Sequence, residues 1–434
     1  MQRRDLLQAA AVAGLAPHLR WHRPDFADWR VNGNRVNGWL GELSRFGANP
    51  EGGVSRIGFS DADVAARAWL QEIMRSVGLT VRIDPAGNVI GELPGSMPGA
   101  KPLLFGSHID SVPHGGNYDG DVGSLGAVEV VATLREKSYR NRHPLWVTVW
   151  CDEERGLTGS RGFIGAITAE QLARPNQDGV PLAQGIRKIG GDPEAMGSYR
   201  NESGSIAGYV ELHIEQGGIL ERTGIDIGVV EGIVTINSVN VTIEGFANHA
   251  GTTPMTDRKN ALLAASELVL AVDRIVKSHP GRQVGTVGRL QVKPGASNVI
   301  PGEVNLTIEL RDLSAEKLSR VWTEIHAEGE RIMTRYGTTW QAPWRAPSEA
   351  DYSNPRVRSA IAEAARMLGL TSQVMPSGAG HDAQSLSRIG PMGMIFVPSV
   401  GGISHSPKEY TRPEDVTNGV NVLMQTMLRL DQEP

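Results

Sequence analysis

Residues 102–154 of the chain read PLLFGSHIDSVPHGGNYDGDVGSLGAVEVVATLREKSYRNRHPLWVTVWCDEE. Two short apolar runs, 102–106 and 145–151, are typical of buried strands, and residues 122–137 between them have helical periodicity. Strand–helix–strand order of this kind predicts a βαβ unit in a largely parallel or mixed sheet. We therefore expect an α/β fold built around this segment.

The sequence on either side of this unit extends the same kind of domain. Residues 79–83 and 89–93 alternate around the turn residues 84–88, which predicts a hairpin. Helical spacing or a short apolar strand run recurs at 29–46, 61–77, 355–368, 394–398 and 413–430. We expect all of these elements to belong to one domain that the middle of the chain interrupts.

The middle of the chain has a different order of elements. Strands are predicted at 235–245, 285–292 and 303–310, and helices at 260–278 and 315–336. This β-α-β-β-α order is typical of a compact α+β domain. The length of 434 residues agrees with two or three domains, and one domain inserted into another is the simplest description.

Composition narrows the classes of function. The chain has 43 basic and 48 acidic side chains, a net charge of −5, so no basic excess favours a nucleic-acid partner. Its one cysteine, Cys151, excludes an intramolecular disulfide and a zinc cluster built on cysteines. Any bound metal must therefore be held by His, Asp and Glu side chains.

The N-terminus resembles an export signal. Arg3 and Arg4 precede a short apolar stretch, a pattern similar to a twin-arginine signal, so we expect residues 1–23 to be a signal segment and the protein to be periplasmic. The stretch is far below the roughly 20 residues that span a bilayer, so we expect no stable membrane span. The alternative is the N-terminal helix of a cytoplasmic protein.

Candidate catalytic residues follow the predicted strands. His108 comes directly after the run 102–106, at the end of a strand where open α/β sheets bind ligands. Asp110 could hold the second imidazole nitrogen of His108, the usual support for a metal-bound histidine. Asp119 lies between glycines, which would let the backbone pass close to a metal.

Further carboxylates and imidazoles follow later in the chain. The acids of Asp152-Glu153-Glu154 end a strand that should neighbour the His108 strand, so one carboxylate could bind a metal while another acts as general base. His213 alternates with Glu211 and Glu215, and His405 lies in a Gly/Ser loop. Together His108, Asp119, Glu154, His213 and His405 form a ligand set of the right size for two divalent ions.

These residues lie in motifs that match a known family in order. The motifs are GSHIDSVPHGGNYDGDVG, DEE, ELHIEQG, GFANHAGTTPM, PGASNVIPGEV, SGAGHDA and GGISHSP. From about residue 32 onward, the chain resembles the dinuclear zinc amidohydrolases. These include N-carbamoyl-L-amino-acid hydrolases, β-ureidopropionases and allantoate amidohydrolases, within the aminoacylase and carboxypeptidase-like metallopeptidase group.

The resemblance implies a fold and an assembly. It implies a mixed-sheet catalytic domain of residues 24–232 and 346–434, interrupted by a smaller α+β dimerisation or lid domain of residues 233–345. The protein would be a homodimer in which His249 reaches the partner's active site and stabilises negative charge on the carbonyl oxygen.

The resemblance also implies a role for each site residue. His108 and His213 would hold one metal, Glu154 and His405 the other, with Asp119 bridging and Glu153 as the base. The metals would be two divalent ions, zinc first, although Mn, Co or Ni would also suit these ligands. Substrate contacts are implied for Gln216, Asn298, Arg311 and His381, with Asn298 and Arg311 on the substrate carboxylate. An ordinary ion pair of Arg311 with Glu309 or Asp312 is the alternative.

The implied reaction is hydrolysis of the ureido C–N bond of an N-carbamoyl-L-amino acid or a close ureido acid. Allantoate hydrolysis and hydrolysis of N-acyl amino acids or peptides are the alternatives, and a non-catalytic ligand-binding protein on the same fold is a rival from another class. The sequence departs from the family in one place. Only Arg155-Gly156-Leu157-Thr158 separates Glu154 from Gly159, and this shorter loop bears on substrate preference.

Overall fold

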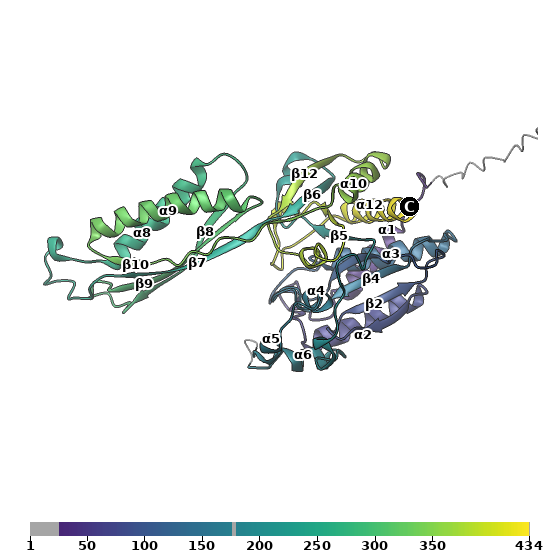
Figure 1. Cartoon of the computed structure of the whole chain (residues 1–434), viewed down its shortest axis with the longest axis horizontal. Helices are drawn as coiled ribbons and strands as arrows, with labels where there is room; N and C mark the ends of the chain where they lie inside the picture. Colours follow the sequence, from purple (N-terminus) through teal and green to yellow (C-terminus); the bar gives the residue numbers. More distant parts are fainter. Residues whose placement is uncertain (1–25, 176–178, 434) are drawn as a thin grey trace, which may run out of the picture.

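The computed structural model describes residues 26–175 and 179–433; the expected signal segment 1–23 lies outside them. Two sheets form two lobes, joined by the long strand β7 (Figure 1). The larger sheet has nine strands in the order β1-β2-β4-β3-β5-β13-β6-β11, with β12 also paired to β6, and the smaller has the order β10-β7-β9-β8. The α/β fold class with a mixed sheet is therefore confirmed.

The strands and helices have the following bounds. The strands are β1 Thr80–Ile83, β2 Val89–Leu93, β3 Leu103–His108, β4 Leu145–Trp150, β5 Gly208–Ile214, β6 Ile227–Ile233, β7 Thr235–Glu244, β8 Val284–Lys293, β9 Glu303–Asp312, β10 Thr339–Gln341, β11 Asp351–Tyr352, β12 Ser372–Ser377 and β13 Met392–Val397. The helices are α1 Gly33–Leu43, α2 Asp61–Ser76, α3 Asp121–Glu136, α4 Thr158–Phe163, α5 Ala169–Ala173, α6 Leu182–Lys188, α7 Ile219–Thr223, α8 Ala261–Ser278, α9 Ala315–Tyr336, α10 Pro355–Met367, α11 Ala383–Leu386 and α12 Pro413–Gln432.

The predicted βαβ unit forms the centre of the larger sheet. Strand β3 pairs in parallel with β4 on one side and β5 on the other, and α3 is the crossover helix. Fourteen consecutive residues of α3 are buried, because α1 and α12 cover the side of this helix that the sheet leaves open. A helix covered on all sides is expected to be largely apolar, and α3 consists mainly of Gly, Ala, Val and Leu. Its two buried acids, Asp121 and Glu129, are paired with Arg56 and Arg35.

Alternate residues of β3 pack into different cores. Leu103 and Phe105 join the core under α1, α3, α10 and α12, whereas Leu104 joins a second core with Trp150 and Phe163 on the other face. This is the period of two expected of a strand buried on both faces. The pairing of β3 with β4 and β5 also brings the C-terminal ends of these three parallel strands side by side at one edge of the sheet.

The smaller sheet extends away from the larger one. Strand β7 follows β6 after the single residue Val234 and pairs with β9 over ten residues, from Thr235 opposite Asp312 to Glu244 opposite Glu303. Helices α8 and α9 pack on this sheet around a core of its own. The predicted strand–helix order is present, with β10 as a further strand. The domain bounds and the role of this lobe in assembly stay predictions.

Three strands of the larger sheet, β6, β11 and β12, were not expected. Strand β6 pairs in parallel with β12 and antiparallel with β11 and β13, so chain segments on both sides of the smaller lobe meet there.

Within the described ranges, no helix is both long enough and apolar enough to span a bilayer.

Candidate metal centre

The candidate site lies at the C-terminal ends of the parallel strands. His108 is the last residue of β3, His213 lies near the end of β5, and Glu153 follows the end of β4. Asp119 comes from the loop before α3. Gly120 has φ +68°, and a Cβ there would lie 2.5 Å from the His108 ring. The glycine after Asp119 is therefore required for the loop to approach the histidine.

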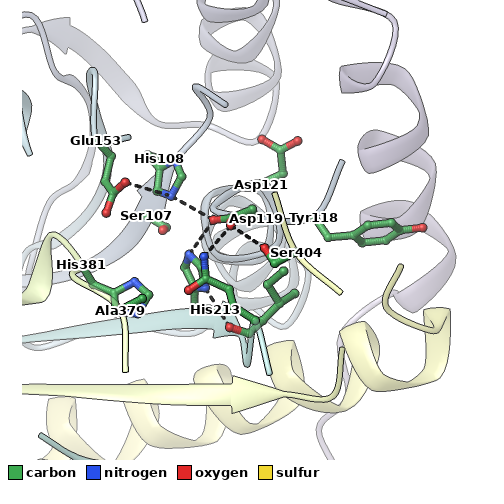
Figure 2. A network of polar contacts seen from close by, with 12 residues as sticks. Ser107, His108, Tyr118, Asp119, Asp121, Glu153, His213, Ala379, His381 and Ser404 are labelled. Atoms are coloured by element: carbon green, nitrogen blue, oxygen red, sulfur yellow. Dashed lines mark hydrogen bonds and ion pairs between the residues drawn. The ribbon is translucent and has the colours of Figure 1, made fainter. Parts of the chain in front are cut away.

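The Asp119 carboxylate stands between three imidazoles. Its Oδ1 lies 3.4 Å from His108 Nε2 and 3.1 Å from His213 Nε2, and its Oδ2 lies 3.4 Å from His405 Nε2. Figure 2 shows His108, His213 and Glu153 converging on the region of Asp119. One oxygen faces one pair of imidazoles and the other oxygen faces the third, the arrangement needed of a carboxylate that bridges two ions.

The ligand atoms form two groups that share Asp119. One group contains His108, Asp119 and His213, and the other contains Asp119, Glu154 and His405, with the atoms of each group within 4.8 Å of one another. A third group, Glu211 with His213 and His381, is also close enough. Glu211 Oε1 already accepts a hydrogen bond from Ser107 Oγ, and its Oε2 accepts one from the Ala383 N–H. Both oxygens of this carboxylate are therefore engaged in hydrogen bonds within the protein.

Two buried ligand atoms lack hydrogen bonds. Within the part of the chain that the structure describes, His213 Nε2 and Glu154 Oε1 are shielded from solvent and make no hydrogen bond of acceptable geometry, although His213 Nε2 lies 3.1 Å from Asp119 Oδ1. A buried polar atom without a partner costs free energy, so such atoms point to a missing ligand or ion. The carboxylate and imidazole donors at this site suit divalent ions.

The charges at the site support the same interpretation. Burial raises the pKa of Glu153 well above its ordinary value and that of Glu154 to about 7. Burial alone would lower the pKa of His108, but Glu153, Asp119 and Asp110 outweigh it and raise that pKa well above its usual range. Too many carboxylates share this space to be ionised together without positive charge. Bound cations would supply that charge, and the residues present fit them.

Asp110 has a different contact from the one expected. His108 Nδ1 lies 3.0 Å from the main-chain oxygen of Asp110 and 3.7 Å from its carboxylate. The carboxylate instead accepts the main-chain N–H groups of Glu153, at 3.1 Å, and Glu154, at 3.2 Å. Asp110 thus supports the imidazole through its backbone and the two glutamates through its side chain.

Two of the expected substrate residues lie beside the cluster. Gln216 Nε2 donates to Asp119 Oδ2 at 2.6 Å. The His381 ring lies 4.5 Å from the His213 ring, and His381 Nε2 lies 2.8 Å from Ser377 Oγ. Burial and the nearby His213 lower the pKa of His381 well below its ordinary value. His381 is therefore a neutral hydrogen-bonding group.

The two remaining substrate residues, Asn298 and Arg311, and the expected catalytic residue His249 belong to the smaller lobe. His249 Nδ1 accepts from the N–H groups of Gly251 and Thr252 in its own loop. Val299 forms a bridge with His249, which places Asn298 beside that loop, at the end of the sheet where Glu244 pairs with Glu303. Neither residue joins the ligand cluster within this chain.

Arg311 lies near the opposite end of β9. It lies eight positions after Glu303, which at about 3.3 Å per position is roughly 26 Å. Within a single chain, Asn298 and Arg311 therefore lie too far apart to bind one carboxylate together, and their expected role on the substrate carboxylate stays a prediction. Arg311 pairs with Glu309, at 2.7 Å, and donates to the Gly378 oxygen at 2.7 Å. The ion pair with Glu309 is thus present in this structure, and a contact of Arg311 with substrate stays a prediction.

Sequence reasoning missed one carboxylate that organises the site. Glu409 Oε1 accepts from the N–H groups of Tyr118 and Asp119. The Ser404 hydroxyl lies 2.8 Å from Glu409 Oε2 and 3.0 Å from Asp119 Oδ2, so its single hydrogen can be donated to either carboxylate. Glu409 follows Pro407 and Lys408 in a polar loop, with no local pattern to mark it. Only the pairing of distant segments reveals its role.

Comparison with known families decides the membership. Residues 104–429 match the model of peptidase family M20/M25/M40. The chain belongs to this family. It is 39% identical to an N-carbamoyl-L-amino acid amidohydrolase of Geobacillus stearothermophilus, over 93% of this chain and 99% of that protein. The resemblance found in the sequence motifs is thus confirmed, and the chain is a member of a hydrolase family.

Two further comparisons agree with this family assignment. A ureidoglycolate hydrolase of Arabidopsis thaliana is 37% identical, over 90% of this chain and 85% of that protein. The crystal structure of a hydantoinase/carbamoylase family amidase from Burkholderia multivorans superposes with a TM-score of 0.85 at 35% identity, covering 93% of this chain and 99% of that one. The match to the amidase structure therefore extends over both lobes of this chain.

Proposed function

We propose that the protein is a metal-dependent amidohydrolase that cleaves the ureido C–N bond of an N-carbamoyl-L-amino acid. The observation that carries this proposal is Asp119, whose two oxygens face separate groups of buried ligand atoms. The carbonyl carbon of a ureido group is poorly electrophilic because both nitrogens donate into it. Two divalent ions, zinc first among the candidates, would polarise that carbonyl and acidify the attacking water.

The residues of the chain divide the remaining work. His108 and His213 would hold one ion and Glu154 and His405 the other, with Asp119 between them. Glu153 would take the proton of the attacking water and pass it to the leaving nitrogen. Its buried side chain, with Oε2 3.9 Å from His108 Nε2, has a raised pKa that suits a group receiving a proton.

Binding of the substrate would combine the two lobes. Gln216 and His381 beside the ligand cluster would orient the ureido group, and Arg311 would bind the α-carboxylate. Because Asn298 and His249 lie at the far end of the smaller sheet, we propose that a partner subunit supplies them. The active site would then be completed only in a homodimer.

The edge of the smaller sheet supports such a dimer. Strand β8 is an edge strand, so the backbone groups on one of its sides have no strand partner within the described chain. Leu290 of β8 is 41% exposed and Leu270 of α8 is 71% exposed. Pairing of β8 and α8 with the same elements of a second copy would cover both, as a two-fold symmetric interface does.

A substrate panel tests this function. The zinc-loaded enzyme would be assayed with N-carbamoyl amino acids, ureidoglycolate, allantoate and N-acetyl amino acids. We expect the highest kcat/KM on an N-carbamoyl amino acid. Ureidoglycolate is the second candidate, because a ureidoglycolate hydrolase is 37% identical to this chain. Faster hydrolysis of N-acetyl amino acids would contradict the proposal.

The N-terminal segment carries a separate proposal. Arg3 and Arg4 with the apolar stretch after them support export of the protein to the periplasm. N-terminal sequencing of the native protein tests it. A chain that begins at residue 1 or 2 would show that this segment is retained.

A further inference from the structure

A cleft of about 1080 Å³ opens beside Glu154, and neither His108 nor His213 lines it. Its apolar lining includes Phe59, Ile167 and Leu182, contributed by the loop before α2 and by the segment of α5 and α6. The cleft is of the size that accommodates small molecules. Because Glu154 lines it, the cleft adjoins the place where the ureido group would react.

The polar lining of this cleft is strongly cationic. Five basic residues line it against the two acids Asp152 and Glu154. Four of the five are already paired, since Arg155 contacts Asp152, Arg174 contacts Glu170, Arg187 contacts Glu194 and Lys188 contacts Asp61. The fifth, Arg161, forms no ion pair with any described residue.

Arg161 is held by weak contacts and is partly desolvated. Its guanidinium donates to the oxygens of Gly156, at 3.3 Å, and Ala166, at 3.5 Å, both long for hydrogen bonds. Burial and the neighbouring Arg388 lower the pKa of Arg161. Arg388 likewise has no ion pair with a described residue. Among the described residues, no carboxylate therefore pairs with either guanidinium group.

The short loop after Glu154 places Arg161 here. Helix α4 begins at Thr158, four residues after Glu154, and Arg161 lies in its last turn. Leu157 at the start of this helix has φ 57°, a left-handed conformation that is unfavourable for a leucine and turns the chain sharply into α4. The tight turn brings Arg161, which has no ion pair with a described residue, to the wall of the cleft that the proposed metal ligand Glu154 also lines.

We propose that this cleft binds the side chain of the substrate and that Arg161 selects side chains ending in a carboxylate. The inference rests on the proposed function and adds a substrate class to it: N-carbamoyl dicarboxylic amino acids. The apolar lining would pack against the methylene groups, and the Arg161 fork would bind the terminal carboxylate in the two-pronged geometry that guanidinium favours.

Matched substrates isolate this contact. N-carbamoyl-L-glutamate and N-carbamoyl-L-glutamine share the ureido group, the α-carboxylate and nearly the same shape, so the ratio of their kcat/KM values reports only on the end of the side chain. We expect the wild type to prefer the glutamate derivative by about 10- to 100-fold, the range for a hydrogen-bonded charge pair. Arg161→Gln should bring this ratio close to one while the rate on the glutamine derivative is kept.

Three further variants control the experiment. Arg161→Lys keeps the charge and should restore part of the preference, and Arg366→Gln removes the same charge from the exposed face of α10, where Arg366 pairs with Glu363, and should leave the ratio as in the wild type. If Arg161→Gln fails to fold, the exposed Arg388→Gln carries the test and should lower the ratio several-fold. An unchanged ratio in the folded Arg161→Gln protein would overturn the proposal, as would a wild type without preference.

A binding measurement separates this inference from the reaction itself. Calorimetric titration of metal-loaded Glu153→Gln protein with the two carbamoyl derivatives does not depend on turnover. Tighter binding of the glutamate derivative, abolished by adding Arg161→Gln, supports the pocket even if ureido hydrolysis is wrong. Hydrolysis of both derivatives with equal binding would retain the proposed function and reject the pocket.

Discussion

The carboxylate of Asp110 accepts the main-chain N–H of Glu153, with Oδ1 3.1 Å from the nitrogen. The contact joins the loop after β3 to the loop after β4, so the position of Glu153 relative to His108 is fixed from a neighbouring strand. Such support allows the side chains of two adjacent glutamates to be held in different positions and to have different roles. Glu153 stands beside His108, whereas Glu154 stands beside His405.

The first prediction separates the roles of these glutamates. Glu153→Gln should lower kcat by orders of magnitude while the metal content stays near that of the wild type, because the base is lost and no ligand is. Glu154→Gln should lose occupancy at one of the two metal positions. Metal analysis of dialysed protein beside steady-state kinetics checks both. Retention of most activity in Glu153→Gln would show that another group is the base.

The second prediction concerns the carboxylate contact of Arg311. Arg311→Lys should lower kcat/KM for an N-carbamoyl amino acid by about 10- to 100-fold, since an ammonium does not replace a planar fork. Arg274→Lys on α8, which pairs with Glu328, provides a matched control that should keep wild-type kinetics. The wild type should also discriminate against the carboxamide of the same substrate. Equal rates on acid and amide would remove the basis for this contact.

The third prediction tests sharing between subunits. His249→Ala chains and Glu153→Gln chains are each expected to be inactive. If His249 serves the partner, a mixed dimer has one site with both lesions and one intact site, so random mixing should restore about a quarter of wild-type activity. Donation within one chain leaves every site damaged. No gain in activity after demonstrated subunit exchange would therefore rule out sharing.

The fourth prediction concerns the pH dependence of stability. Burial raises the pKa of Asp63 from 3.8 to about 6 in the folded protein. The folded state keeps this proton at pH values where the unfolded chain has released it, so the contribution of Asp63 to folding weakens as pH rises from about 4 to 6. Asp63→Asn removes this titration and should reduce the loss of unfolding free energy over that window by about 3 kcal/mol.

Urea unfolding at several pH values, on metal-free protein of both kinds, measures this difference. Asp63 accepts the Phe59 N–H at 2.8 Å, and the amide oxygen that Asp63→Asn introduces can still accept it, so the fold should survive the change. Parallel pH profiles for the two proteins would show that Asp63 does not titrate as stated.

Local patterns predicted the elements that local forces determine. The βαβ unit, the β1–β2 hairpin and the strand–helix order of the smaller lobe follow from periodicity and turn residues. His108 and Glu153 could be placed because parallel strands end at one edge of a sheet. These inferences needed only residues close together in the sequence.

Other parts of the structure depend on distant pairings that periodicity does not record. Strand β12 joins β6 across the whole smaller lobe, and Glu409 holds a loop some 290 residues earlier. The backbone contact of Asp110 with His108 has no sequence signal, because any residue offers a carbonyl. The separation of Asn298 from Arg311 likewise appeared only when the register of β7 and β9 was known.

The continuity of β6 and β7 through Val234 has a mechanical consequence. A ten-residue strand is an arm of about 33 Å, so a rotation of 10° at its base would move its far end by roughly 6 Å. The sheet register would stay intact, because β9 pairs with β7 along its whole length. In a dimer joined through β8 and α8 of the two smaller lobes, a rotation that brings one His249 toward a partner would also reposition the other. The two active sites would then open and close together.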